Sequence, residues 1–143
     1  MSNQPPVVVP DLSEFERALA NVRQVAIETP VLHSHFLSEL VGQEVWLKCE
    51  NLQRTGAYKV RGAFNRMSKL TKEEKKKGVI AASAGNHAQG VALAAKKLGI
   101  KATVYMPFGA SLPKVAATRN YGAKVVLFGA TFAEALKAAQ DQA

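Results

Sequence analysis

The feature that most constrains the fold is an alternation of short apolar strands with helical segments, which fills the chain from about position 44 onward. The predicted strands are 44–49, 78–82, 101–106 and 124–128, and the predicted helices are 57–70, 86–98, 111–121 and a last helix from Thr131. This spacing is typical of strand–helix–strand units joined by right-handed crossovers. It predicts an α/β fold with an open, mainly parallel sheet and flanking helices.

The N-terminal part does not follow this alternation. Residues 1–10 hold three prolines and predict an extended arm. Residues 11–26 have the apolar period of a helix, with a capping box from Ser13 to Glu16 at its start. A short helix is expected at 35–41, ended by the glycine that follows. These segments are expected to lie apart from the sheet.

Composition excludes several classes of protein. Apolar residues make up 48% and charged residues 21% of the 143 positions, as in ordinary globular domains. No apolar run approaches the ~20 residues of a membrane-spanning helix, and the first residues do not form a secretion signal. Cys49 is the only cysteine, which suits a reducing, cytoplasmic compartment.

The net charge of +8 raises the question of a nucleic-acid partner. The basic residues are dispersed, and the densest run, 72–77, contains two acids after a Thr71-to-Glu74 capping pattern. That run is typical of a short solvated helix. Aromatic residues are not interleaved with the basic ones, as stacking on bases requires. We therefore expect neither a nucleic-acid partner nor a membrane, and no residues with metal-ligand spacing are present.

Lys59 is the first candidate for chemistry, because it follows a Thr-Gly-Ala-Tyr turn and lies in the first turn of a predicted helix. The positive end of a helix dipole disfavours an ammonium group there. Tyr58 and Val60 are expected to exclude water and to favour a neutral, nucleophilic amine. Four small residues leave room for a planar group: Gly56, Ala57, Gly62 and Ala63. This suits a lysine that forms a Schiff base, and the alternative is an ordinary surface lysine.

Residues 83–87, Ser-Ala-Gly-Asn-His, form a second candidate loop between a predicted strand and the next helix. Ligands of open parallel sheets bind beyond the carboxyl ends of the strands, and helix N-termini bind anions. Gly85 and Gly90 have the spacing of a phosphate-binding P-loop, but the Lys and Ser or Thr that complete it are missing. A carboxylate site is expected, and the alternative is an ordinary turn with Asn86 as the helix cap.

Together the two loops resemble those of the fold-type II pyridoxal-phosphate enzymes, and most closely those of the catabolic threonine ammonia-lyases (threonine dehydratases). The matching segments are 48–63 and 82–91, supported by Met106-Pro107 and by 114–118. The similarity runs from about Asp11 to the end of the sequence. Such enzymes have two domains, so the resemblance implies that 44–143 is the small domain and that 1–43 belongs to the large one.

The resemblance implies a role for each site residue. Lys59 would hold pyridoxal 5'-phosphate and take the α-proton of the substrate, Tyr58 would border the cofactor ring, and Asn86 would hydrogen-bond its phenolic oxygen. The substrate carboxylate would be held by the whole second loop, namely Ser83, Ala84, Gly85, Asn86 and His87. The implied reaction converts L-threonine, and L-serine, to a 2-oxo acid and ammonia, in isoleucine biosynthesis or threonine catabolism.

Two further expectations come from the resemblance. Relatives that racemise serine carry a serine at the position of Ala84, so alanine favours elimination. Catabolic relatives are oligomers that AMP often activates at a subunit interface. The positions that match this effector site are Arg54, Thr55, Gln89 and Tyr121.

The sequence lacks the glycine-rich loop that holds the cofactor phosphate in these enzymes. The 143 residues alone are therefore expected to be an incomplete and inactive part, with apolar surface exposed on the N-terminal helices. Two alternatives remain: a serine dehydratase or racemase of the same family, and a non-enzymatic, truncated domain that binds anions or partners. The oligomeric state and the preference between threonine and serine stay open.

Overall fold

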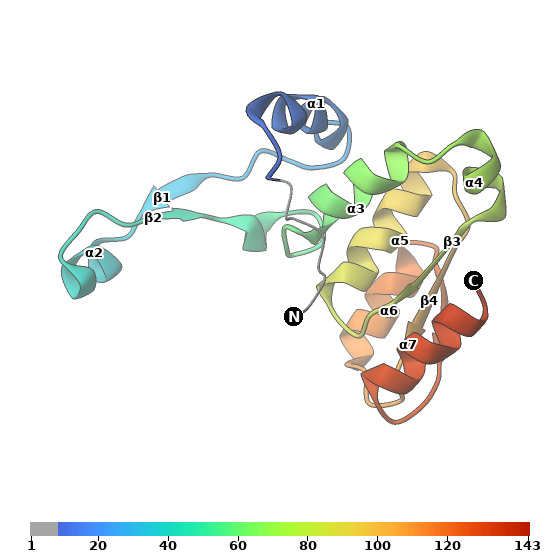
Figure 1. The fold of residues 1–143 in the computed structure, drawn as a ribbon. Coiled ribbons are helices and arrows are strands. Elements are labelled where there is room, and N and C mark those ends of the chain that lie inside the picture. Colours follow the sequence, from blue (N-terminus) through green and yellow to red (C-terminus); the bar gives the residue numbers. More distant parts are fainter. Residues whose placement is uncertain (1–8) are drawn as a thin grey trace, which may run out of the picture.

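The computed structural model describes residues 9–143 (Figure 1). Most of the arm expected at 1–10 therefore lies outside the described residues. The N-terminal elements are α1 (Leu12–Val22), β1 (Val31–His33), α2 (His35–Val41), β2 (Trp46–Lys48) and the 3-10 helix η1 (Glu50–Leu52). The following elements are α3 (Lys59–Ser68), α4 (Lys72–Lys77), β3 (Val79–Ala82), α5 (Asn86–Leu98), β4 (Ala102–Met106), α6 (Leu112–Asn120), β5 (Lys124–Leu127) and α7 (Phe132–Asp141).

The parallel sheet consists of β3, β4 and β5 in that order, which confirms three of the four strands predicted for it. Side chains alternate between its two faces. Val104 and Met106 of β4 are fully buried in the main core with α5, whereas Tyr105 packs with Ala135 and Ala139 of α7. Helices α5 and α6 therefore cover one face of the sheet and α7 covers the other (Figure 1).

The strand predicted at 44–49 forms, but its predicted place in the parallel sheet is wrong. Residues 46–48 pair antiparallel with β1, with Val31 opposite Lys48 and His33 opposite Trp46. All three residues of β2 are exposed, so the strand has no buried face to place against helices. The hairpin leaves the body of the molecule as an arm with α2 at its tip (Figure 1), and it joins residues from both sides of position 43.

Helix α1 begins with a different cap from the one predicted at Ser13. Asp11, not Ser13, is the N-cap, because the Asp11 carboxylate accepts a hydrogen bond from the backbone N–H of Glu14 at 3.0 Å. The Ser13 hydroxyl donates to that same carboxylate at 2.7 Å. Aspartate caps helices at least as well as serine and stands two residues earlier in the chain. The capping pattern predicted from Thr71 to Glu74 is confirmed at the start of α4, and a second capping box, from Thr131 to Glu134, starts α7.

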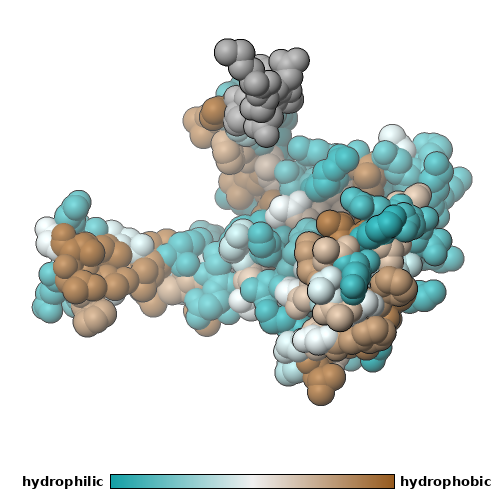
Figure 2. Space-filling view, turned by 60° about the horizontal axis from the view of Figure 1, so that its bottom comes forward, coloured by the Kyte–Doolittle hydropathy of each residue, from teal (hydrophilic) through white to brown (hydrophobic). Residues whose placement is uncertain are grey.

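Large apolar side chains are exposed on the N-terminal elements. Leu12 is 73% exposed, Phe36 73% and Trp46 58%. Figure 2 shows apolar surface gathered on the projecting arm. The exposed apolar surface expected on the N-terminal helices is therefore confirmed. No helix within residues 9–143 has the length and apolar character that crossing a membrane requires.

Candidate active site

Lys59 is the first residue of α3, and α3 lies directly against α5 at this point. A Cβ placed on Gly90 of α5 would stand 3.1 Å from the carbonyl carbon and oxygen of Lys59 and from the nitrogen of Val60. A larger residue would push these backbone atoms away by a few tenths of an ångström, so glycine is favoured at this approach. The glycine at position 90 therefore fixes where Lys59 begins its helix.

The turn before Lys59 is fastened to the segment after α1. The side-chain amide of Gln53 accepts a hydrogen bond from the Ile27 N–H at 3.0 Å and donates to the Ile27 carbonyl at 2.9 Å. The buried hydroxyl of Thr55 donates to the Ala57 carbonyl at 3.1 Å. These contacts hold the Thr-Gly-Ala-Tyr turn in one conformation, with Gly56 in the left-handed region.

The amine of Lys59 lies beside the ring of Tyr58, with Nζ 4.8 Å from the ring centroid. Tyr58 is 57% exposed, and Val60 is fully buried in the core rather than over the amine. The exclusion of water that the sequence suggested is therefore not present within residues 9–143. The ring is in place to border a planar group, but one side of the amine is open to solvent.

Ser83 organises the second loop. Its backbone N–H donates to the Tyr105 carbonyl, and its hydroxyl accepts hydrogen bonds from the N–H groups of Gly85 and Ala88, each at 3.2 Å. The alternative with Asn86 as the cap is wrong: Gly85 is the N-cap residue, and Asn86 is the first residue of α5 with its side chain exposed. The hydroxyl of Ser83 does the capping from two residues earlier.

Two backbone donors remain available at the start of α5. Within the described part of the chain, the N–H groups of Asn86 and His87 have no hydrogen-bond acceptor. They lie at the positive end of the helix dipole. An anion such as a carboxylate is the natural partner of two such groups.

His87 connects the two loops. Desolvation lowers its pKa, and the positive charge of Lys59 lowers that pKa further. The imidazole is therefore neutral at pH 7 and lies close enough to Lys59 to sense its charge. His87 also lines a hollow of about 270 Å³ together with Gly62 and Ala63 of α3. The structure thus brings Lys59 and the 83–87 loop together at one end of the α3–α5 pair.

The four effector positions are only partly brought together. The Tyr121 hydroxyl donates to the Arg54 carbonyl at 2.8 Å, and the Arg54 Nε donates to the Val25 carbonyl at 2.8 Å. Thr55 follows Arg54 and is buried. Gln89 lies half-buried on α5, with no side-chain hydrogen bond to the other three in the part of the chain that is described.

Sequence reasoning missed an ion pair at the base of the arm. Arg61 donates to both carboxylate oxygens of Glu50 at 2.8 and 2.7 Å, and Thr29 donates to the same carboxylate. These contacts lower the pKa of Glu50 to about 2, mainly through the Arg61 hydrogen bond. The pair ties α3 to η1 and to the segment before β1. No local sequence pattern predicts this cluster, because Arg61 lies 11 residues and Thr29 lies 21 residues from Glu50.

Sequence reasoning also missed the position of Lys114 in α6. Its Nζ lies 3.9 Å from the point where a Cβ on Gly85 would stand. The one available signal was its place in the first turn of a helix, the same unusual place that drew attention to Lys59.

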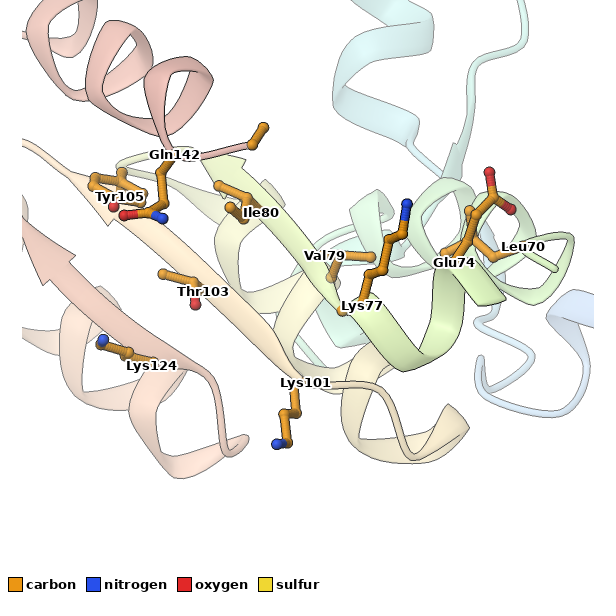
Figure 3. Close-up of a pocket in the computed structure, with 12 residues that line it drawn as sticks. Leu70, Glu74, Lys77, Val79, Ile80, Lys101, Thr103, Tyr105, Lys124 and Gln142 are labelled. Carbon is orange, nitrogen blue, oxygen red and sulfur yellow. The ribbon is translucent and has the colours of Figure 1, made fainter. Parts of the chain in front are cut away.

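A larger hollow lies elsewhere and is not the candidate site. It has a volume of about 610 Å³ and is lined at the start of the strands by Gly78, Lys101 and Lys124 (Figure 3). The ammonium groups of Lys77 and Lys101 point away from each other in Figure 3. Ligands of parallel sheets bind at the opposite, carboxyl ends of the strands.

Comparisons with known proteins agree with this geometry. Residues 22–143 match the family described as "Pyridoxal-phosphate dependent enzyme". The chain is 52% identical over 133 residues to an L-threonine ammonia-lyase of Thermotoga maritima, covering 93% of this chain and 32% of that protein. The chain thus spans about one third of the length of this curated relative.

Solved structures show the same fold. Threonine deaminase isoform 2 from Solanum lycopersicum superposes with a TM-score of 0.80 at 42% identity, covering 96% of this chain and 45% of that one. Maize serine racemase superposes with a TM-score of 0.84 at 36% identity, covering 92% and 41%.

Proposed function

Because the chain belongs to the family of pyridoxal-phosphate dependent enzymes, we propose that it is part of a threonine ammonia-lyase in which Lys59 holds the cofactor. The proposed reaction is the elimination and deamination of L-threonine, and of L-serine, to a 2-oxo acid and ammonia. The observation that carries the proposal is the position of Lys59, which is fixed against Gly90 and stands beside the Ser83–His87 loop.

The described residues fit two parts of such a site: the part around the lysine that holds the cofactor, and the part that holds the substrate carboxylate. Lys59 has no ion-pair partner among residues 9–143, and the small residues around it leave space. A Cβ on Gly62 would meet no atom within 4 Å. Pyridoxal phosphate, when bound, supplies an electron sink for a carbanion at the α-carbon.

This chain's own groups would then handle binding and proton transfer. The N–H groups of Asn86 and His87 would hold the substrate carboxylate, since they are unpaired donors at a helix N-terminus. Lys59 would act as the general base that takes the α-proton. The neutral imidazole of His87 adds no positive charge that would oppose protonation of Lys59.

The proposal also gives roles to Tyr58, Asn86 and Ala84. Tyr58 would border the cofactor ring and Asn86 would meet its phenolic oxygen. Ala84 offers no hydroxyl that could act as a base on the opposite face, which favours elimination over racemisation. A serine dehydratase is the second candidate, because one methyl group on the substrate is worth only ~1–3 kcal/mol of discrimination.

We also propose the arrangement of domains and subunits that the sequence predicts. Residues 44–143 would form a small domain in a cytoplasmic homo-oligomer, with 1–43 packed on a larger domain through the exposed apolar surface.

AMP would bind near Arg54, Thr55, Gln89 and Tyr121. The contact between Tyr121 and Arg54 supports that assignment, and unchanged stability and activity during an AMP titration would exclude it.

The proposal is tested by titrating the chain with pyridoxal phosphate and following the absorbance of a protein-bound Schiff base. We expect the band to appear in the wild type and to be lost in Lys59→Arg. Lys69→Arg, which changes an exposed lysine at the other end of α3, is the matched control and should keep the band. An equal band in Lys59→Arg would contradict the proposal.

A further inference from the structure

The proposed site contains one more cation than the two candidate loops provide. Lys114 belongs to α6, which follows β4, and its Nζ stands 3.9 Å from the position of a Cβ on Gly85, in the loop that follows β3. The side chain therefore reaches from one strand–helix connection to the next. It places an ammonium group over the turn that leads into α5.

The protein's own contacts do not explain this placement. Lys114 lies in the first turn of α6, where the helix dipole disfavours a positive charge. Within residues 9–143 its amine makes no hydrogen bond and no ion pair, and the residue is half-buried. Holding a long side chain in such a place costs conformational entropy. The described residues therefore do not account for the position of this ammonium.

The surroundings define what that partner must be. The unpaired N–H groups of Asn86 and His87 lie in the same loop as Gly85, and the charge of Lys59 acts on His87. The acid at this edge of the sheet, Glu134, already accepts hydrogen bonds from the N–H groups of Ala130 and Thr131. The loop thus carries two unpaired N–H donors, with the Lys114 ammonium beside Gly85 and the charge of Lys59 acting on His87, and this favours an anionic ligand.

We propose that Lys114 is a substrate-recognition residue whose ammonium pairs with the carboxylate of the amino acid held by the Ser83–His87 loop. This inference rests on the proposed function, which already places the carboxylate at that loop. One carboxylate oxygen would accept from the backbone N–H groups and the other from Lys114, since a carboxylate offers about four acceptor positions. The site would then reject an amino-acid amide.

The test measures ligand binding by the chain itself. The ¹⁵N-labelled protein is titrated at constant ionic strength with L-threonine, L-threoninamide or inorganic phosphate, and the backbone amide shifts of Gly85, Asn86 and His87 are followed. Lys114→Gln removes the charge and Lys114→Arg keeps it. Lys72→Gln is the matched control, because Lys72 is an exposed lysine in the first turn of another helix, α4.

We expect saturable shifts with L-threonine in the wild type, about fivefold weaker binding in Lys114→Gln, and near wild-type binding in Lys114→Arg and Lys72→Gln. L-threoninamide should bind the wild type and Lys114→Gln equally weakly. If Lys114→Gln fails to give a dispersed spectrum, Lys114→Met is the second uncharged variant.

Two results would overturn the inference and leave the proposed function intact: equal L-threonine affinity in the wild type and Lys114→Gln, or tighter binding of phosphate through Lys114. The absence of any shift with L-threonine in the wild type would overturn both, because the carboxylate would not be bound at this loop.

Discussion

At the scale of single residues, the candidate site depends on where charges stand rather than on how many there are. Lys59 and Lys114 each lie in the first turn of a helix, and His87 stands close enough to Lys59 to have its pKa lowered. The start of α5 adds two unpaired N–H donors. An anionic, amine-reactive ligand would satisfy all of these groups at once.

The pKa of His87 gives a direct prediction. Desolvation is the larger cause of its lowering and Lys59 the smaller, so Lys59→Met should raise the His87 pKa but leave it below 6.5. Titration of the imidazole signals by NMR measures this. Lys69→Met, on the opposite end of α3, should leave the His87 pKa unchanged. No change in Lys59→Met would mean that the two groups are not neighbours.

The Glu50–Arg61 pair gives a prediction about stability. Glu50→Gln should lower the free energy of unfolding at pH 7 by about 1–2 kcal/mol; this is less than the pKa change alone suggests, because both groups are partly exposed to solvent. Since the pKa of Glu50 is lowered to about 2 in the folded state, this stabilisation is present above the unfolded value of ~4.3. It is lost as the pH falls from there toward 2, where the folded-state carboxylate is protonated.

Denaturant unfolding of the wild type and Glu50→Gln at pH 7 and at about pH 2.5 measures this. The difference between the two proteins should shrink at the lower pH. Glu44→Gln, which changes an exposed glutamate without a hydrogen-bond partner in the described chain, is the control. A difference that stays constant with pH would show that the ion pair is not its source.

At the scale of elements, the contact between α3 and α5 positions Lys59. Gly90→Ala should destabilise the protein by about 1–3 kcal/mol, since the added methyl group meets backbone atoms at 3.1 Å and the two helices must separate. Gly62→Ala is the matched control within α3, because its methyl group would meet nothing within 4 Å. It should be neutral or stabilising by up to about 1 kcal/mol.

Thermal or denaturant unfolding of Gly90→Ala and of Gly62→Ala measures the change in stability that each substitution causes. Equal stability of Gly90→Ala and Gly62→Ala would mean that the close approach at Gly90 does not fix the start of α3. The same comparison extends to the cofactor: Gly90→Ala should also weaken the reaction of Lys59 with pyridoxal phosphate, because the lysine moves with its helix.

The elements also show how far the sequence predicts the structure. The apolar alternation predicted β3, β4 and β5 and the helices between them, because each of these strands is joined to the next by a local helical crossover. It misplaced β2, whose pairing with β1 depends on an antiparallel hairpin and leaves all of β2 exposed. The motifs predicted Lys59 and the 83–87 loop. They could not predict that Lys114 lies beside Gly85 or that Glu50 pairs with Arg61, because each contact joins two different elements of the fold.

At the scale of the whole molecule, the site is open. Tyr58 is 57% exposed, Asn86 is exposed, His87 is only partly desolvated, and the apolar arm projects into solvent (Figure 2). Catalysis of this kind needs water to be kept from the reacting centre. The chain spans about one third of the length of its threonine ammonia-lyase relative, and within the described residues nothing covers the candidate site.

We therefore expect the 143-residue chain to bind pyridoxal phosphate weakly and to form no 2-oxobutanoate from L-threonine. A coupled assay for the 2-oxo acid, with cofactor present in excess, measures this. Measurable turnover that depends on Lys59 would contradict the role given to water exclusion, although it would support the assignment of the lysine.

The most direct test of the central claim is to trap the cofactor on the protein. The chain is mixed with pyridoxal phosphate, the Schiff base is reduced with borohydride, and the modified lysine is found by peptide mapping. We predict that Lys59 carries most of the label at low cofactor concentration and that Lys69, exposed at the other end of α3, carries little. Label spread evenly over the exposed lysines, with no preference for Lys59, would contradict the account.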